Sequence, residues 1–232
     1  MTAPALVVLA AGLGARLGRP FPKPLAELRD GRSILQQQWD ALRRAFPDSH
    51  AHIVVGFKKE LIMEAFPDAL FVYNPDFSET NTSKSLLRAL RLAHVGGVLW
   101  LNGDVVFDPQ VLDLLAVQVD REETAVCVNH TSVGSEEVKY SLDDAGNIRE
   151  LSKNVEGALG EAVGINFVAA RDRLTLMRHL EACDDSDYFE RGIETAIAAK
   201  ELVVRPVDVS DYTAIEVDTE DDLGAANASF HS

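Results

Sequence analysis

The chain begins with an apolar segment that runs directly into a glycine-rich turn, and no other feature restricts the fold as much. Residues 5–10 form an apolar run typical of a buried strand, and glycines recur through residues 12–18. Glycine lets backbone N–H groups approach an anion closely and adopts positive φ without steric cost. Arg16 and Lys23 add two positive charges to this turn. The segment therefore predicts a strand–loop unit that binds a polyphosphate.

Two other phosphate-binding loops do not fit this spacing. A dinucleotide-binding fingerprint needs G-x-G-x-x-G at the start of a helix, and the spacing of Gly12, Gly14 and Gly18 is one residue too wide. Prolines within residues 18–24 also prevent a helix there. No Gly-Lys-Ser/Thr follows, which excludes a Walker loop. The remaining alternative is an ordinary glycine turn after a buried strand, and the two basic residues favour the polyphosphate loop over it.

Length and charge limit the classes of protein and partner. A chain of 232 residues is long enough for one domain with a continuous core. No apolar run approaches the ~20 residues that span a bilayer. A net charge of −15 argues against nucleic acid and anionic membranes as partners, so an anionic ligand would need local basic groups and a divalent cation. Cys127 and Cys183 lie far apart, which predicts a reduced, cytoplasmic protein. A homodimer is left open.

Strands and helices alternate in the first half, which predicts a single α/β domain over residues 1–232. We expect a Rossmann-like, doubly wound sheet that is mixed but mostly parallel, with a small β-hairpin extension. The expected strands are 5–10, 52–57, 70–73, 98–101, 124–129, 162–168, 202–207 and 214–217, and the hairpin is 138–142 with 148–151. One helix is expected after the capping box that begins at Ser33, and another after Asp108-Pro109. The other expected helices are 58–66, 83–92, 171–182, 188–199 and 219–228.

Acidic residues occur where a metal ion would accompany a bound phosphate. Asp104 follows a strand end and a glycine, and ligands of such sheets bind at the carboxyl ends of the strands. Glu216 and Asp218 are two residues apart on a strand and so point to one face. With Asp104 they would form an oxygen site suited to Mg²⁺. A turn and an acidic edge strand are the alternatives, and the phosphate-binding loop favours the metal site over them.

These residues together resemble the small nucleotidyltransferases that join a nucleoside triphosphate to a phosphorylated alcohol or sugar. The opening matches their pattern L-A-A-G-x-G-x-R followed by P-K-x-L, and Asn102-Gly103-Asp104 matches their mid-chain aspartate motif. Within that superfamily the chain is most similar to the choline-phosphate, inositol-phosphate and phosphonate cytidylyltransferases. This narrower likeness lies in residues 53–57, 73–74, 81–86, 138–140, 148–153, 188–190 and 215–219.

The resemblance implies a GT-A-like nucleotidyltransferase fold and a role for each matching residue. About residues 1–130 would bind the nucleotide and about 131–215 the acceptor. Arg16 and Lys23 would be catalytic, and Lys23 would contact the α-phosphate. The nucleotide-binding residues would be Leu9, Ala10, Ala11, Gly12, Gly14, Asn81, Ser85 and Asn102. The acceptor-binding residues would be Glu137, Lys139, Lys153, Tyr188 and Glu190, and the Mg²⁺ ligands Asp104, Glu216 and Asp218.

One departure from the choline-phosphate pattern bears on the acceptor. Those enzymes tend to carry an aromatic residue where this chain has Glu137-Val138, as one wall of a cage around the quaternary ammonium group. Tyr188 and Phe189 remain as candidate walls, and Lys139 offers a cation to an anionic group. This favours a phosphonate or another phospho-alcohol as the acceptor and does not exclude phosphocholine. Alternatively, the two aromatic residues belong to the core and Lys139 is an exposed charge of the hairpin.

The implied reaction is attack by an acceptor oxygen on the α-phosphorus of CTP, with release of pyrophosphate. The second pKa of the acceptor is ~6, so its attacking oxygen is already ionised at neutral pH. No general base is therefore required. One alternative is a sugar-1-phosphate nucleotidyltransferase that uses UTP or dTTP, and another is a non-catalytic nucleotide sensor on the same fold. Lys23, Asp104 and Asp218 together argue against the sensor, which would need neither metal ligands nor a group for the transition state.

Overall fold

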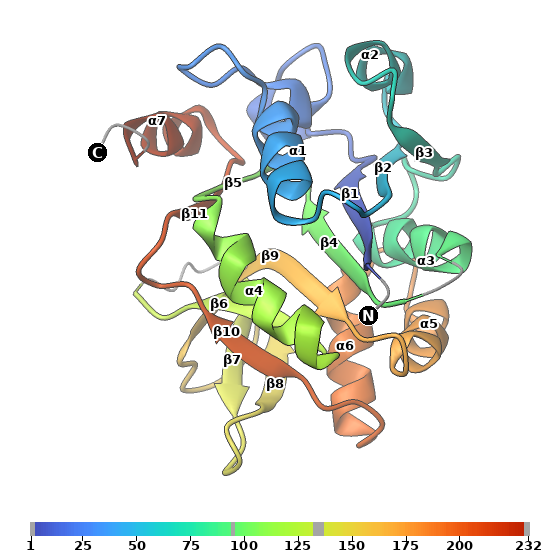
Figure 1. The fold of residues 1–232 in the computed structure, drawn as a ribbon, viewed down its shortest axis with the longest axis vertical. Coiled ribbons are helices and arrows are strands. Elements are labelled where there is room, and N and C mark those ends of the chain that lie inside the picture. Colours follow the sequence, from blue (N-terminus) through green and yellow to red (C-terminus); the bar gives the residue numbers. More distant parts are fainter. Residues whose placement is uncertain (1–2, 94–95, 132–136, 230–232) are drawn as a thin grey trace.

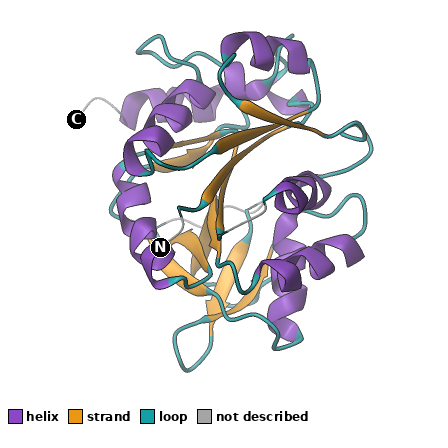
Figure 2. Ribbon diagram, turned by 45° about the vertical axis from the view of Figure 1, so that its right-hand side comes forward, coloured by secondary structure: helices purple, strands orange, loops and turns teal. Residues whose placement is uncertain are grey.

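The computed structural model describes residues 3–93, 96–131 and 137–229 and has a mixed central sheet flanked by helices (Figures 1 and 2). Along the sheet the strands follow the order β10-β6-β9-β4-β1-β2-β3. β1 pairs in parallel with β2 and β4, whereas β9 runs antiparallel to β4 and β6. These strands are β1 (Ala5–Ala10), β2 (Ala51–Val55), β3 (Leu70–Tyr73), β4 (Val98–Asn102), β6 (Ala125–Asn129), β9 (Gly160–Val168) and β10 (Arg205–Asp208). The predicted mixed, mostly parallel sheet is confirmed.

Helices cover both faces of this sheet. Alternate residues of β1 face opposite sides, since Leu6 and Val8 belong to one apolar core and Val7 and Leu9 to the other. The first core receives apolar residues of α1 (Ile34–Ala45), α2 (Lys59–Ala65) and α4 (Gln110–Arg121). The second receives those of α3 (Thr82–Leu92), α5 (Arg173–Ala182) and α6 (Phe189–Ala198) (Figure 1). The sheet is therefore doubly wound, as predicted.

The predicted hairpin is also present, as β7 (Lys139–Leu142) and β8 (Ile148–Ser152). Gly146, at φ +78°, occupies the turn between them. β7 continues the main sheet by pairing with β9. Helix α1 begins after Ser33, whose side chain accepts a hydrogen bond from the Gln36 amide, as the capping box predicts.

A short antiparallel pair at one edge of the molecule differs from the prediction. β11 (Ala214–Glu216) was expected, but it pairs with β5 (Val105–Phe107), a strand too short for its sequence pattern to reveal. α7 (Glu220–Ser229) follows β11. A third apolar cluster joins this C-terminal segment to the loop after β1, through Leu17, Ile34, Val106, Val217 and Leu223. The C-terminal segment therefore packs against the loop that follows β1.

The remaining differences are small shifts of element boundaries. β10 begins at Arg205 rather than at residue 202. α4 begins one residue later than expected, because Asp108 accepts a hydrogen bond from the Gln110 amide at 2.9 Å and Pro109 takes the capping position. Cys127 and Cys183 are both free thiols. None of the helices in the described residues is long and apolar enough to cross a membrane.

Candidate functional site

The loop after β1 adopts the conformation that its glycines predict. Gly14 has φ +61°, and a Cβ atom there would lie 3.0 Å from the Cβ of Lys23. Lys23 stands in a short 3-10 turn, Lys23–Leu25, and its side chain is buried. No α-helix passes through residues 18–24, as the prolines require. Gly14 thus lets Lys23 pack directly against the glycine-rich loop.

Gly103 sets the position of Asp104. Its amide donates to the Leu9 carbonyl at 2.9 Å, and a Cβ atom at residue 103 would lie 2.6 Å from that oxygen. The Val217 amide donates to the carbonyl of Asp104 at 2.9 Å, which brings the end of β11 to this turn. Only glycine permits this approach of β4 to β1, so the turn places Asp104 beside the loop.

Gln38 supports the same turn and was not singled out from the sequence. Its fully buried side chain donates from Nε2 to the carbonyls of Asn102 (2.8 Å) and Val105 (2.7 Å). These two bonds satisfy backbone groups that the bend between β4 and β5 leaves unpaired. The sequence feature that could have identified Gln38 is its place on the apolar stripe of α1, three positions after Leu35.

Basic and acidic side chains converge above this turn. The Nζ atom of Lys23 lies 2.6 Å from Asp104 Oδ2 and 2.5 Å from Asp218 Oδ1. Asp218 Oδ2 also forms an ion pair with Arg16 Nη1, at 2.7 Å. One carboxylate oxygen from each of Asp104, Glu216 and Asp218 lies within 4.8 Å of the others. The residues predicted from three distant parts of the chain therefore form one cluster.

The pKa values in this cluster reflect an excess of negative charge. Burial would lower the pKa of Lys23, but Asp104 and Asp218 outweigh it and raise that pKa above its ordinary value. Burial raises the pKa of Glu216 to about 9, and the charges of Asp104, Glu137 and Asp218 add to the effect. The cluster holds more carboxylates than Lys23 and Arg16 neutralise.

A cavity of about 310 Å³ opens beside the cluster. Among the predicted site residues, those that line it are Leu9, Ala10, Gly12, Gly14, Arg16, Lys23, Asn81, Asn102, Asp104, Glu137, Lys153, Tyr188, Glu190, Glu216 and Asp218. Four further residues also line the cavity and were not among the predicted site residues; they are Pro24, Thr82, Gly103 and Val138. One cavity is therefore lined by most of the predicted nucleotide-binding residues and by most of the predicted acceptor-binding residues.

Three predicted site residues do not line this cavity. Ala11 accepts a hydrogen bond from the Phe57 amide through its carbonyl. Ser85 is buried and accepts a hydrogen bond from Asn74 Nδ2 at 3.1 Å. Lys139 lies on β7, where its neighbours across the strands are Ser152 and Glu161. Direct ligand contacts for these three remain predictions.

The two candidate cage residues have different environments. Tyr188 is 44% exposed, lines the cavity, and has the Nζ atom of Lys153 4.9 Å from its ring centre. Phe189 is fully buried and packs edge-on against Trp100, with ring centres 5.5 Å apart. The interpretation of Phe189 as a core residue therefore holds, and the described residues provide only one aromatic wall.

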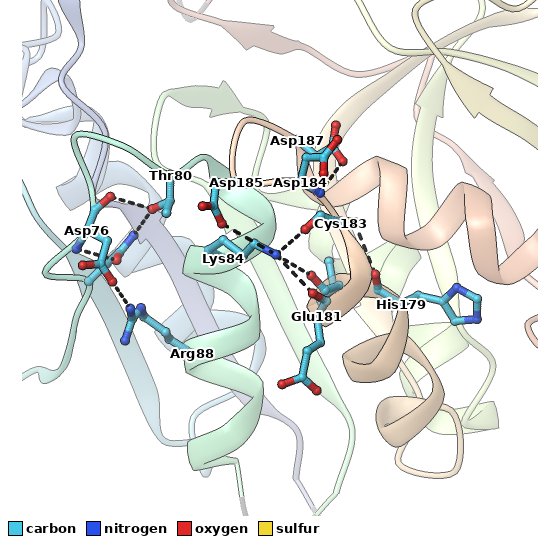
Figure 3. A network of polar contacts seen from close by, with 12 residues as sticks. Asp76, Thr80, Lys84, Arg88, His179, Glu181, Cys183, Asp184, Asp185 and Asp187 are labelled. Carbon is cyan, nitrogen blue, oxygen red and sulfur yellow. Dashed lines mark hydrogen bonds and ion pairs between the residues drawn. The ribbon is translucent and has the colours of Figure 1, made fainter.

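The loop that carries Tyr188 is held by α3 (Figure 3). Lys84 extends from α3 and donates to the carbonyls of Leu180, Glu181 and Cys183 at the end of α5. The Asn81 amide donates to the carbonyl of Asp185 at 2.7 Å. Lys84 and the Asn81 amide, which precedes the first turn of α3, thus bind carbonyls at the end of α5 and in the loop that follows it.

We expect Lys84→Met to lower the free energy of unfolding by about 2 kcal/mol, because partly buried carbonyls at the end of α5 lose a charged donor. Urea denaturation of both proteins measures the difference. Lys200→Met is the matched control, since Lys200 is exposed and follows α6. Equal stability of the Lys84 variant and the wild type would mean that this lysine does not hold the loop.

A mixed, doubly wound sheet with a basic, glycine-rich loop and a carboxylate cluster at its strand ends is the architecture of a nucleotidyltransferase. The chain belongs to the MobA-like NTP transferase family, whose domain model matches residues 6–200. The resemblance inferred from the sequence motifs is therefore confirmed.

Curated relatives are named for phosphonate chemistry. The chain is 31% identical to the CMP-5'-(3-aminopropyl)phosphonate synthase of Streptomyces rubellomurinus, and the match covers 97% of this chain and 38% of that protein. It is 24% identical to the 2-aminoethylphosphonate cytidylyltransferase of Lancefieldella rimae, over 94% of this chain and 90% of that one. The chain therefore spans less than half the length of the Streptomyces relative.

Solved structures share the fold at low sequence identity. The inositol-1-phosphate CTP transferase from T. maritima superposes with a TM-score of 0.78 at 17% identity, over 95% of this chain and 92% of that one. The CTP:phosphocholine cytidylyltransferase from Streptococcus pneumoniae gives the same score and identity over 98% and 99% of the two chains. These likenesses confirm the predicted nucleotidyltransferase fold.

Proposed function

We propose that this chain is a CTP-dependent cytidylyltransferase that joins CMP to a phosphonate or phospho-alcohol acceptor and releases pyrophosphate. The observation that carries the proposal is the position of Lys23 between Asp104 and Asp218 in a cavity that Arg16 and acceptor-type residues also line. The names of the two curated relatives support CTP as donor and a phosphonate as acceptor.

In the proposed reaction, an acceptor oxygen forms a bond to the α-phosphorus of CTP. The bond from that phosphorus to the bridging oxygen of the β-phosphate breaks, and pyrophosphate leaves with the bond's electron pair. The two reactants are anions, and two unit charges ~4 Å apart repel by about 4 kcal/mol at an effective dielectric of 20. Lys23 and Arg16 would offset this repulsion, while the cavity would hold the reacting atoms in line.

The carboxylate cluster fits a Mg²⁺ ion. Asp104 Oδ1 is buried without a hydrogen-bond partner among the described residues, and Asp104, Glu216 and Asp218 supply only oxygen ligands. A bound Mg²⁺ would stabilise negative charge on the phosphates. Those three residues would hold it, and Lys23 and Arg16 would remain available to the phosphates.

We expect Mg²⁺ binding to weaken as the pH falls. Because the pKa of Glu216 is raised to about 9 by burial and then by neighbouring carboxylates, its carboxyl group is protonated at neutral pH in the metal-free protein. A metal ligand must be deprotonated, so binding releases a proton and the affinity should fall about tenfold per pH unit below that pKa. Isothermal titration in buffers of different ionisation enthalpy measures both effects.

The Glu216→Gln variant is the control for that titration and should release no proton at this step. An affinity that is constant between about pH 7 and 9 in the wild type would exclude Glu216 from the metal ligands.

Pyrophosphate release tests the proposed function. The four ribonucleoside triphosphates and dTTP are each combined with 2-aminoethylphosphonate, 2-hydroxyethylphosphonate, phosphocholine, inositol phosphate or a hexose phosphate. We expect release with CTP and a phosphonate or phospho-alcohol. Release only with UTP or dTTP and a hexose phosphate would favour a sugar-1-phosphate nucleotidyltransferase, and no release in any combination would favour a nucleotide sensor.

A further inference from the structure

Glu190 is a buried carboxylate at the acceptor end of the cavity. It is the second residue of α6, is 7% exposed, and lines the cavity. Its Oε2 atom has no hydrogen-bond partner among the described residues. A buried polar oxygen without a partner is costly, and a protonated carboxyl group would equally need an acceptor for its O–H. The position is therefore suited to a ligand that supplies a donor.

The surroundings of Glu190 favour a cationic donor. Glu137 lines the same cavity, and within the described ranges neither carboxylate forms an ion pair with a protein cation. Burial raises the pKa of Glu190 to about 7, and the charge of Glu137 adds to the effect. Lys153 is near enough to oppose that shift, but its Nζ atom lies over the ring of Tyr188 instead of bonding to Glu190. This end of the cavity thus has an excess of negative charge.

We propose that Glu190 selects acceptors that end in a primary ammonium group and discriminates against acceptors that end in a quaternary one. This inference rests on the proposed function, since it concerns the acceptor of that reaction. A primary ammonium group donates N–H bonds and can satisfy the free oxygen of Glu190.

A quaternary ammonium group has no N–H donor, and its usual site is an aromatic cage. Tyr188 is the one aromatic residue among the described residues that line this cavity, because Phe189 packs into the core against Trp100. A trimethylated acceptor would therefore leave Glu190 without its hydrogen bond and would gain little from stacking. The carboxylate of Glu190, rather than the ring of Tyr188, therefore selects the acceptor.

The experiment compares three phosphonates that differ only in their terminal group. They are 2-aminoethylphosphonate, 2-hydroxyethylphosphonate and the N,N,N-trimethyl derivative of the first. Pyrophosphate release with saturating CTP gives kcat/KM for each with the wild type, with Glu190→Gln and with Glu194→Gln. Glu194 is the matched control, because it lies one turn further along α6, pairs with Arg191 at 2.7 Å and does not line the cavity.

We expect the wild type to prefer the primary amine over both other acceptors. The ratio of kcat/KM for the amine to that for the hydroxyl compound should fall about 10- to 100-fold in Glu190→Gln, the effect of losing a charged hydrogen bond. It should be unchanged in Glu194→Gln. The ratio of the kcat/KM values for two acceptors, measured on one enzyme preparation, does not depend on the fraction of enzyme that is folded.

Two results would overturn the inference while leaving the proposed function intact. One is a wild type that uses the trimethyl derivative or the hydroxyl compound as well as the primary amine, which decides the question even if Glu190→Gln does not fold. The other is an unchanged ratio in Glu190→Gln. If the wild type releases no pyrophosphate with CTP and any acceptor, the proposed function itself fails and this inference fails with it.

Discussion

Replacement of Lys23 by alanine should lower kcat by about 100- to 1,000-fold while changing the KM for CTP much less. The α-phosphate gains charge only as the acceptor oxygen attacks, so a cation placed there acts mainly in the transition state. The Nζ atom of Lys23 lies within 2.6 Å of two carboxylates, and its raised pKa keeps it protonated at neutral pH. Steady-state kinetics of pyrophosphate release measure both parameters.

Arg19→Ala is the matched control for Lys23→Ala. Arg19 belongs to the same loop, but its partner is Glu220 at the start of α7, and the cavity does not include it. We expect this variant to keep wild-type kinetics. Equal changes in kcat and in the KM for CTP would contradict this role, and a raised KM with unchanged kcat would make Lys23 a ground-state ligand of the nucleotide.

Asp218→Asn should lower turnover by about 100-fold or more at ordinary Mg²⁺ concentrations. The substitution keeps the shape of the side chain but removes a carboxylate that lies within 4.8 Å of the oxygens of Asp104 and Glu216. Higher Mg²⁺ should restore part of the activity, because Asp104 and Glu216 would still bind the proposed ion weakly. Turnover measured as a function of Mg²⁺ concentration tests this expectation.

Glu220→Gln serves as the control for Asp218→Asn. It removes a carboxylate two residues further on, whose side chain is 59% exposed and pairs with Arg19. Full activity of Asp218→Asn at ordinary Mg²⁺ would remove Asp218 from the metal ligands and leave it as the partner of Arg16 and Lys23.

The part of the site that sequence patterns predicted best is the part formed by local geometry. Gly14 and Gly103 stand where a side chain would meet Lys23 or the Leu9 carbonyl, so both glycines could be interpreted directly from their place after a strand. The carboxyl ends of β1 and β4 meet because the two strands are parallel neighbours. Hence the loop and Asp104 were expected in one crevice, where the structure has them.

Other features depended on contacts between distant segments. The hydrophobic pattern of residues 188–199 predicted a helix but did not show whether Tyr188 or Phe189 faces the cavity. Phe189 packs against Trp100 in the core, so Tyr188 is the one that lines the cavity. The sequence places Gln38 on the apolar stripe of α1, but only the bend between β4 and β5 shows which two carbonyls its side chain binds. The motifs that contain Ser85 and Lys139 likewise did not show that these two side chains lie outside the cavity lining.

Local sequence was sufficient for the βα alternation, the conformation of the glycine-rich loop and the charged residue types of the candidate site, because strand period, glycine conformation and residue charge act over a few residues. Tertiary structure decided how β5 pairs with β11 and which carboxylates at the acceptor end lack partners. Those outcomes depend on which distant surfaces bury each other, and burial is a property of the whole packed chain. Within the part of the chain that the structure describes, Glu190 Oε2 lacks a hydrogen-bond partner only because of that packing, and the proposed acceptor selectivity depends on it.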